Sequence, residues 1–102
     1  MTKPRIPDDG TVSAWHQYVV RHPRRDDLRA WLARGGVGTE IHYPVACHRQ
    51  KCYEGTPLSR SRMPVAERLA GEILSPPIAD VSPGEAQRVA CLINSFENQQ
   101  SR

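Results

Sequence analysis

The stretch IHYPVACHRQKC, residues 41–52, places two histidines and two cysteines within twelve positions. Histidine and cysteine are the usual ligands of zinc, which takes four of them in tetrahedral geometry. The four candidates are spaced five, one and four residues apart. Side chains of adjacent residues diverge by about 100° on a helix or 180° on a strand, so Cys47 and His48 do not converge on one ion. Only His48 and Cys52 share a helical face. The spacing of His42, Cys47, His48 and Cys52 therefore predicts no metal site.

The cysteines offer two other kinds of chemistry. A disulfide between Cys47 and Cys52 is unfavourable if their segment is helical, because five helical residues separate Cα atoms by roughly 8 to 9 Å and bridging needs less than about 7 Å. Nucleophilic catalysis by Cys47 with a neighbouring histidine needs a third, orienting group that the sequence does not supply. We expect free thiols in a reducing compartment, with Cys91 a small core residue.

Cofactor and phosphate chemistry have no clear carrier. Lys3 lies in a loose segment and Lys51 among polar residues, where a solvated amine is expected rather than a Schiff-base lysine. The glycines of RGGVG, residues 34–38, follow a helix and lack the Lys-Ser/Thr ending of a phosphate loop. The remaining candidates are His42 and Tyr43, which period-two geometry places on opposite faces of a strand. They are either packed residues or the border of a ligand pocket at the end of the sheet.

Hydrophobic periodicity and turn residues predict the elements that position these side chains. The helix after His22 has an apolar face of Leu28, Trp31 and Leu32 and stops at a glycine pair. Ser82 and Glu85 form a capping box at the start of the last helix. The elements in order are a strand at 14–21, a helix at 22–36, a strand at 39–44, a weakly helical segment at 47–55, a loop at 55–62, a helix at 63–74, an extended stretch at 75–80 that could hold a third strand at Ile78, and a helix at 82–98.

This order predicts an α/β (α+β two-layer) fold: a small two- to three-stranded, mainly antiparallel sheet covered on one face by three or more helices. We divide the chain into a loose lead-in at 1–12, one domain at 13–98 and a frayed tail at 99–102. The first strand is apolar on both sides, but the predicted helices can cover only one face of the sheet. An uncovered apolar sheet face is therefore expected, and such faces mark interfaces.

Composition and charge exclude other classes. The chain has 102 residues and a net charge of +3, from 14 basic and 11 acidic residues, which fits one domain. The arginines of the first helix alternate with Asp26 and Asp27, so a solvated, mixed-charge face is expected rather than a nucleic-acid surface. No apolar run could span a bilayer, and the start MTKPRIPDDG lacks the apolar stretch of a signal peptide. We expect a cytoplasmic protein that binds neither nucleic acid nor membrane.

Four segments in order resemble the C-terminal small domain of the DegT/StrS-type (DegT/DnrJ/StrS) sugar aminotransferases: WHQYVVR, RRDDLRAWLARGGVGTEIHYPVACH, MPVAERLAGEILSPPI and SPGEAQRV. The resemblance runs from about Ile6 to Asn98. It implies the aspartate-aminotransferase fold and pyridoxal-phosphate-dependent amino transfer to nucleotide-linked keto-sugars. It also implies that His42 and Tyr43 border the sugar-substrate side of the cleft. His48 matches a position where the family often has histidine.

The resemblance also implies which parts of the enzyme lie outside this chain. In the family, the large N-terminal domain carries the cofactor lysine, so this chain is expected to hold no pyridoxal phosphate and to be inactive alone. Pro76 departs from the family's usual apolar residue in that strand. The first hypothesis is a C-terminal domain or fragment of a sugar aminotransferase that docks on a large domain. The alternative is a free-standing interaction module that pairs through its exposed sheet face, with a partner or with itself.

Overall fold

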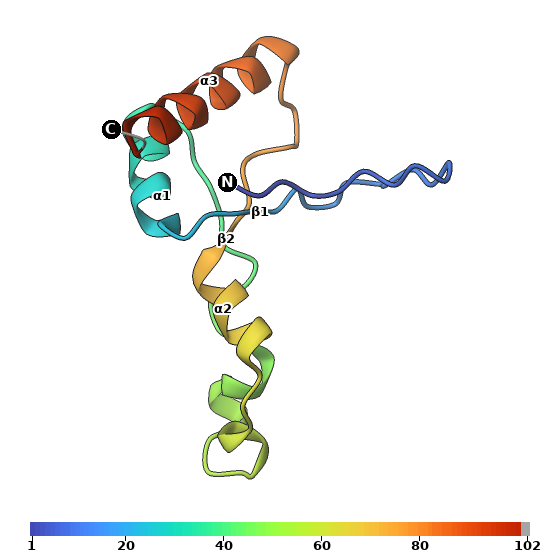
Figure 1. Cartoon of the computed structure of the whole chain (residues 1–102), viewed down its shortest axis with the longest axis vertical. Helices are drawn as coiled ribbons and strands as arrows, with labels where there is room; N and C mark the ends of the chain where they lie inside the picture. Colours follow the sequence, from blue (N-terminus) through green and yellow to red (C-terminus); the bar gives the residue numbers. More distant parts are fainter. Residues whose placement is uncertain (101–102) are drawn as a thin grey trace.

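The structure is a computed structural model that describes residues 1–100. It comprises a small sheet, three α-helices and a projecting arm (Figure 1). The elements in chain order are β1 (Val20–Arg21), α1 (Arg25–Arg34), the 3₁₀ turns η1 (Cys47–Arg49), η2 (Lys51–Tyr53) and η3 (Leu58–Arg60), α2 (Pro64–Glu72), β2 (Ile73–Leu74) and α3 (Pro83–Gln100). None of the helices within the described residues is both long and apolar enough to cross a bilayer.

The sheet is antiparallel, with Val20 opposite Leu74 and Arg21 opposite Ile73. Single bridges extend it on both sides, from Thr2 to Arg21 and from residue 40 to residue 75. A two-stranded antiparallel sheet with three α-helices confirms the predicted α+β fold class. The bridge at Thr2 also shows that the start of the predicted lead-in is bonded to the sheet, through two backbone hydrogen bonds of 2.9 Å.

Both predicted strands are shorter than expected, and the reasons are local. Trp15 has φ of 48°, a left-handed conformation that a strand cannot contain. Its N–H donates to Ser13 Oγ at 3.1 Å, which closes a turn instead of a ladder. The segment 39–44 pairs only through Glu40. The third strand predicted at Ile78 is wrong: pairing on that side of the sheet ends at residue 75.

The helices agree better with the predictions, except at their ends. α1 has the predicted apolar face, and Ser82 caps α3 by accepting the Glu85 N–H at 3.1 Å. The helix predicted at 63–74 ends at Glu72, because residues 73 and 74 pair with β1. The predicted tail 99–102 is helical through residue 100, and its last two residues lie outside the described part of the chain.

The core lies between α1, α3 and the sheet. Leu28, Leu32, Leu74 and Val20 are the largest fully buried side chains, and Ile93 joins them from α3. A second contact fixes how closely the two helices approach. Trp31 Nε1 donates to the Leu92 carbonyl at 2.9 Å, and a Cβ added to Gly35 would lie 2.8 Å from a methyl group of Leu92. Gly35 is therefore needed for the close packing of α1 against α3, and Gly36, with φ of 82°, takes the left-handed conformation that follows α1.

A buried arginine joins α1 to the end of α2. Arg25 is 8% exposed, and its Nη1 donates to the carbonyls of Ala70 at 3.1 Å and Ile73 at 2.9 Å. Its Nε donates to Asp26 at 2.7 Å. Ala70 lies in the last turn of α2, where no intrahelical donor remains, and Ile73 is the first residue of β2. The guanidinium therefore supplies a donor at the point where the helix passes into the strand. The expectation that the arginines of this helix are solvated is wrong for Arg25.

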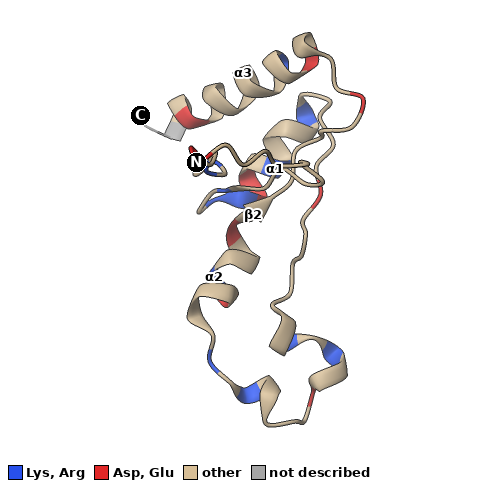
Figure 2. Cartoon of the chain, turned by 90° about the vertical axis from the view of Figure 1, so that its right-hand side faces the viewer, with Lys and Arg blue, Asp and Glu red and all other residues tan. Residues whose placement is uncertain are grey.

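Residues 42–63 together with α2 form the arm, which extends away from the body (Figures 1 and 2). α2 buries none of its residues, and Val65 is 64% exposed. Figure 2 shows the Lys and Arg segments spread over the body and the arm rather than gathered in one region. This distribution fits the expectation of a solvated charge pattern.

Replacing Arg25 by Met should destabilise the fold by about 2 to 3 kcal/mol, because two buried carbonyls lose a charged donor. The matched control is Arg24→Met. Arg24 pairs with Asp27 at 2.7 Å, but its side chain is 55% exposed, so the loss should stay under about 1 kcal/mol. Urea denaturation followed by circular dichroism measures both. Equal losses for the two variants would contradict the structural role of Arg25.

Candidate substrate-binding site

His42 is held at the edge of the sheet. Glu40 and Ser75 exchange two backbone hydrogen bonds of 3.0 and 2.7 Å, which bring the chain after Glu40 alongside β2. The Nδ1 atom of His42 then lies 2.9 Å from Ser75 Oγ. Ser75 is buried and His42 is half-buried. The imidazole is thus positioned by one hydrogen bond, and residues 1–100 provide no hydrogen bond to its other ring nitrogen.

Tyr43 lies beside His42 rather than on an opposite face of a strand. The two rings meet edge to face with centroids 5.4 Å apart, and the peptide bond between them is cis. The prediction of opposite faces is wrong because regular pairing stops at Glu40, so period-two alternation no longer applies. Tyr43 is 66% exposed. The structure therefore brings together the two residues that the sequence singled out.

A pocket of about 360 Å³ opens beside His42. Its polar lining includes His16, Gln17, Thr39 and Ser75, and its apolar lining includes prolines of the 75–80 segment. The Thr39 hydroxyl is buried and has no hydrogen-bond partner within residues 1–100. An unpaired buried hydroxyl is costly, and it suits a site that a polar ligand completes. Sequence reasoning missed His16 and Thr39, because neither lies in a recognisable spacing with His42.

His48 has a structural position in the arm. It is 2% exposed, and its Nε2 donates to Glu67 Oε1 at 2.9 Å. Arg49 donates to the same oxygen at 2.8 Å. These two hydrogen bonds, that from His48 first, lower the pKa of the Glu67 carboxyl below its ordinary value of 4.5. The cluster ties η1 to the first turn of α2 within the arm.

The cysteines do not join a site. Cys47, Cys52 and Cys91 are free and exposed. The expectation that Cys91 lies in the core is wrong, because it occupies the outward side of α3, next to the buried positions. Within the described residues no group of three or more histidine, cysteine or acidic side chains could hold a metal ion. Within the described residues, the four candidate ligands therefore do not gather at one site: His42, Cys47, His48 and Cys52.

Comparison with known proteins agrees with the fold. A family described as the DegT/DnrJ/EryC1/StrS aminotransferase family matches residues 1–94. Two relatives are the erythromycin biosynthesis sensory transduction protein EryC1 of Saccharopolyspora erythraea, 48% identical over 65% of this chain, and the dTDP-3-amino-3,6-dideoxy-alpha-D-galactopyranose transaminase of Aneurinibacillus thermoaerophilus, 34% identical over 91% of this chain. The chain belongs to the DegT/DnrJ/EryC1/StrS aminotransferase family.

The solved structures give the same result in three dimensions. The crystal structure of S. venezuelae DesV in complex with a ketimine intermediate superimposes with a TM-score of 0.83 and 35% sequence identity. It covers 93% of this chain, which in turn covers 26% of that chain. The chain spans 18% of EryC1 and 25% of the A. thermoaerophilus transaminase. It therefore corresponds to about a quarter or less of these longer proteins.

Replacing Glu67 by Gln should loosen η1 at neutral pH and have less effect in acid. A carboxyl with a lowered pKa stabilises the folded state above the ordinary value of 4.5, and this contribution is lost as the pH falls through the lowered pKa. The reporter is the Arg49 amide, which is bonded to the Ala46 carbonyl at 2.9 Å.

Hydrogen exchange of that amide should be faster in Glu67→Gln than in the wild-type chain at pH 6, and the ratio of the two rates should approach one below pH 4.5. Glu54→Gln, an exposed change in the same arm, is the matched control and should leave the ratio near one throughout. A ratio that does not change with pH would show that the ionised Glu67 does not hold the turn.

Proposed function

We propose that the chain is the C-terminal small domain of a pyridoxal-phosphate-dependent nucleotide-sugar aminotransferase, which transfers an amino group to a keto-sugar. The observation that carries this proposal is the family match over residues 1–94. The superposition on DesV at 35% identity supports it. The dTDP-sugar transaminase from A. thermoaerophilus supports the substrate class. The chain is not catalytically competent alone.

In this proposal His42 and Tyr43 border the sugar side of the substrate cleft. His42 is oriented by Ser75, so its second ring nitrogen can exchange a hydrogen bond with a sugar hydroxyl. Tyr43 is exposed and presents a phenol hydroxyl and an aromatic face. Their roles are to bind and orient the substrate, since neither is placed with a partner that would make it a nucleophile.

The residues present do not fit pyridoxal phosphate, which acts as the electron sink in amino transfer and is joined to a lysine. The chain has two lysines. Lys51 lies in η2 on the arm, and Lys3 lines a separate, apolar cavity. Neither lines the pocket beside His42. We therefore place the cofactor and its lysine in the remainder of the longer protein.

The alternative is a free-standing interaction module derived from this domain. The arm favours it, since Tyr43, Val65 and other large apolar side chains are exposed there. In both proposals residues 13–98 form the functional domain, and the protein is cytoplasmic. The partner is a large aminotransferase domain or a second copy of this chain. The experiment below separates the two, because only the first proposal predicts activity.

The test is a graft in which residues 1–98 of this chain replace the matching part of DesV. We expect a folded protein that transaminates a dTDP-linked keto-sugar. His42→Ala in the graft should lower kcat/KM about tenfold, the cost of one lost hydrogen bond to substrate. Tyr43→Ala should act in the same direction.

Tyr53→Ala is the matched control. Tyr53 is a tyrosine of the same arm and is 40% exposed, but it lies in η2, whereas the ring of Tyr43 contacts that of His42. Its removal should leave kcat/KM unchanged. A folded, cofactor-loaded graft without activity would contradict the proposed function. An active graft that is insensitive to His42→Ala would contradict the assigned site alone.

A further inference from the structure

The hydrogen bond between Ser75 and His42 can be made in two ways, and they give His42 opposite roles. If the Ser75 hydroxyl donates to Nδ1, the ring proton is on Nε2 and His42 is a donor toward a ligand. If the Nδ1–H group donates to Ser75 Oγ, Nε2 is bare and His42 is an acceptor. The distance of 2.9 Å between Nδ1 and Oγ fits both arrangements. The surroundings of Ser75 decide between them.

The Ser75 hydroxyl has one hydrogen-bond partner within residues 1–100, the ring of His42. The backbone of Ser75 is occupied elsewhere: its N–H donates to the Glu40 carbonyl at 2.7 Å, and its carbonyl accepts the Glu40 N–H at 3.0 Å. Ser75 is also 6% exposed. A buried hydroxyl proton without an acceptor is costly, and Nδ1 is the acceptor that the described residues offer it. This favours the arrangement in which Ser75 donates.

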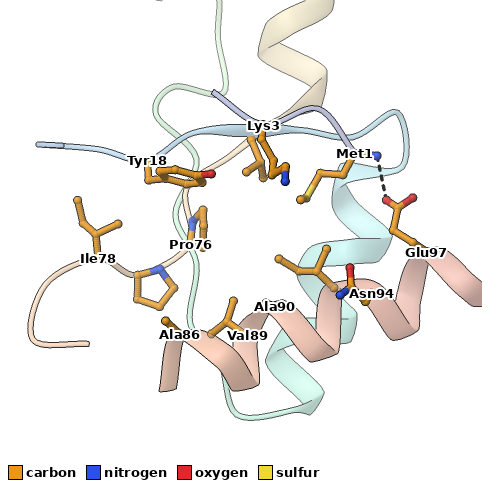
Figure 3. Close-up of a pocket in the computed structure, with 13 residues that line it drawn as sticks. Met1, Lys3, Tyr18, Pro76, Ile78, Ala86, Val89, Ala90, Asn94 and Glu97 are labelled. Atoms are coloured by element: carbon orange, nitrogen blue, oxygen red, sulfur yellow. Dashed lines mark hydrogen bonds and ion pairs between the residues drawn. The ribbon is translucent and has the colours of Figure 1, made fainter. Parts of the chain in front are cut away.

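A neighbouring cavity is separated from this hydroxyl. It is an open groove of about 700 Å³ between the sheet and α3. Figure 3 shows Tyr18 and Pro76 on its side toward the sheet, opposite Val89 of α3. Tyr18 and Pro76 also line the pocket beside His42, whereas Ser75 lines that pocket and not the groove. Ser75 therefore belongs to the pocket that His42 borders.

His22 provides a comparison within the same chain. Its Nδ1 accepts the backbone N–H of Arg24 at 2.9 Å, and a backbone N–H can only donate. The proton of the neutral ring is therefore on Nε2, which lies 2.9 Å from a carboxylate oxygen of Glu97. His42 has the same pattern if the Ser75 hydroxyl takes the place of the backbone N–H.

We propose that Ser75 is a positioning residue that fixes the proton of His42 on Nε2, so that His42 donates to the substrate. This inference rests on the proposed function. The substrate atom that faces Nε2 is then an oxygen that accepts, from a phosphate, a keto group or a hydroxyl. Because Ser75 holds the ring in one orientation and one tautomer, less conformational freedom is lost when the substrate binds. Ser75 acts through His42 and not on the substrate directly.

The first test reads the tautomer. Nitrogen-15 NMR of the chain at about pH 8, where histidine rings are ordinarily neutral, distinguishes a bare ring nitrogen from a protonated one. His42, assigned by comparison with His42→Ala, should show the pattern of His22, with Nδ1 bare and Nε2 protonated. Ser75→Ala should give a mixture of tautomers at His42 and leave His22 unchanged. A protonated Nδ1 in the wild-type chain, or a His42 pattern that Ser75→Ala does not alter, would overturn the proposal.

Thr39→Val is the matched control. Thr39 lines the same pocket, and its buried hydroxyl has no hydrogen-bond partner within residues 1–100. Removing this hydroxyl should leave the tautomer of His42 unaltered. A change as large as that in Ser75→Ala would mean that the tautomer responds to the pocket as a whole, which contradicts a specific role of Ser75.

The second test uses the DesV graft to ask whether Ser75 acts through His42. Ser75→Ala should lower kcat/KM about threefold to tenfold, as expected for one lost hydrogen bond. Ser75→Thr keeps a hydroxyl and should restore most of the loss. In a graft that already carries His42→Ala, the further change Ser75→Ala should have no effect, because the two residues act as one unit. Additive losses would contradict the proposal.

Inhibition of the graft by dTDP identifies the accepting oxygen. His42→Ala should raise the inhibition constant of dTDP about tenfold if a phosphate oxygen accepts, and should leave it unchanged if a sugar oxygen accepts. The tautomer also separates this inference from the proposed function. An inactive, folded graft with His42 protonated at Nε2 in the chain would contradict the function alone. An active graft with His42 protonated at Nδ1 would contradict the role of Ser75 alone.

Discussion

The buried guanidinium of Arg25 is the interaction on which the arrangement of this chain depends. It joins the start of α1 to the carbonyls of Ala70 in the last turn of α2 and Ile73 in β2, where the helix passes into the strand. A buried cation is stable only when its donors are used, and here backbone carbonyls and the Asp26 carboxylate use them. The direction of α2, and with it the arm, follows from this one junction.

The candidate site follows from the same junction. Once β2 lies against β1, the next residue, Ser75, is fixed at the point where it pairs with Glu40 and contacts His42. The proposed substrate-binding residue His42 is therefore positioned by the sheet and not by the arm that begins at it. The arm has its own local support in the hydrogen bonds of His48 and Arg49 to Glu67.

Sequence patterns predicted the features that depend on local periodicity: the apolar face of α1, the cap of α3 at Ser82 and the α+β class. They did not predict features set by distant contacts. Arg25 is of a type expected on the surface of a helix. It is buried because it donates to the carbonyls of Ala70 and Ile73, 45 and 48 residues away along the chain. The same limit applies to Trp15 and Cys91. Trp15 lies in a turn closed by Ser13 rather than in a strand, and Cys91 lies on the exposed side of α3 rather than in the core.

The body and the arm leave part of the apolar surface of this domain uncovered by the chain itself. α2 buries no residue, and the first half of α3 borders an open groove. The most direct measurement is hydrogen exchange of the α2 amides, compared between the isolated chain and the DesV graft. We expect weak protection of these amides in the isolated chain and strong protection in the graft. Equal, strong protection in both would show that the isolated chain is already a complete domain.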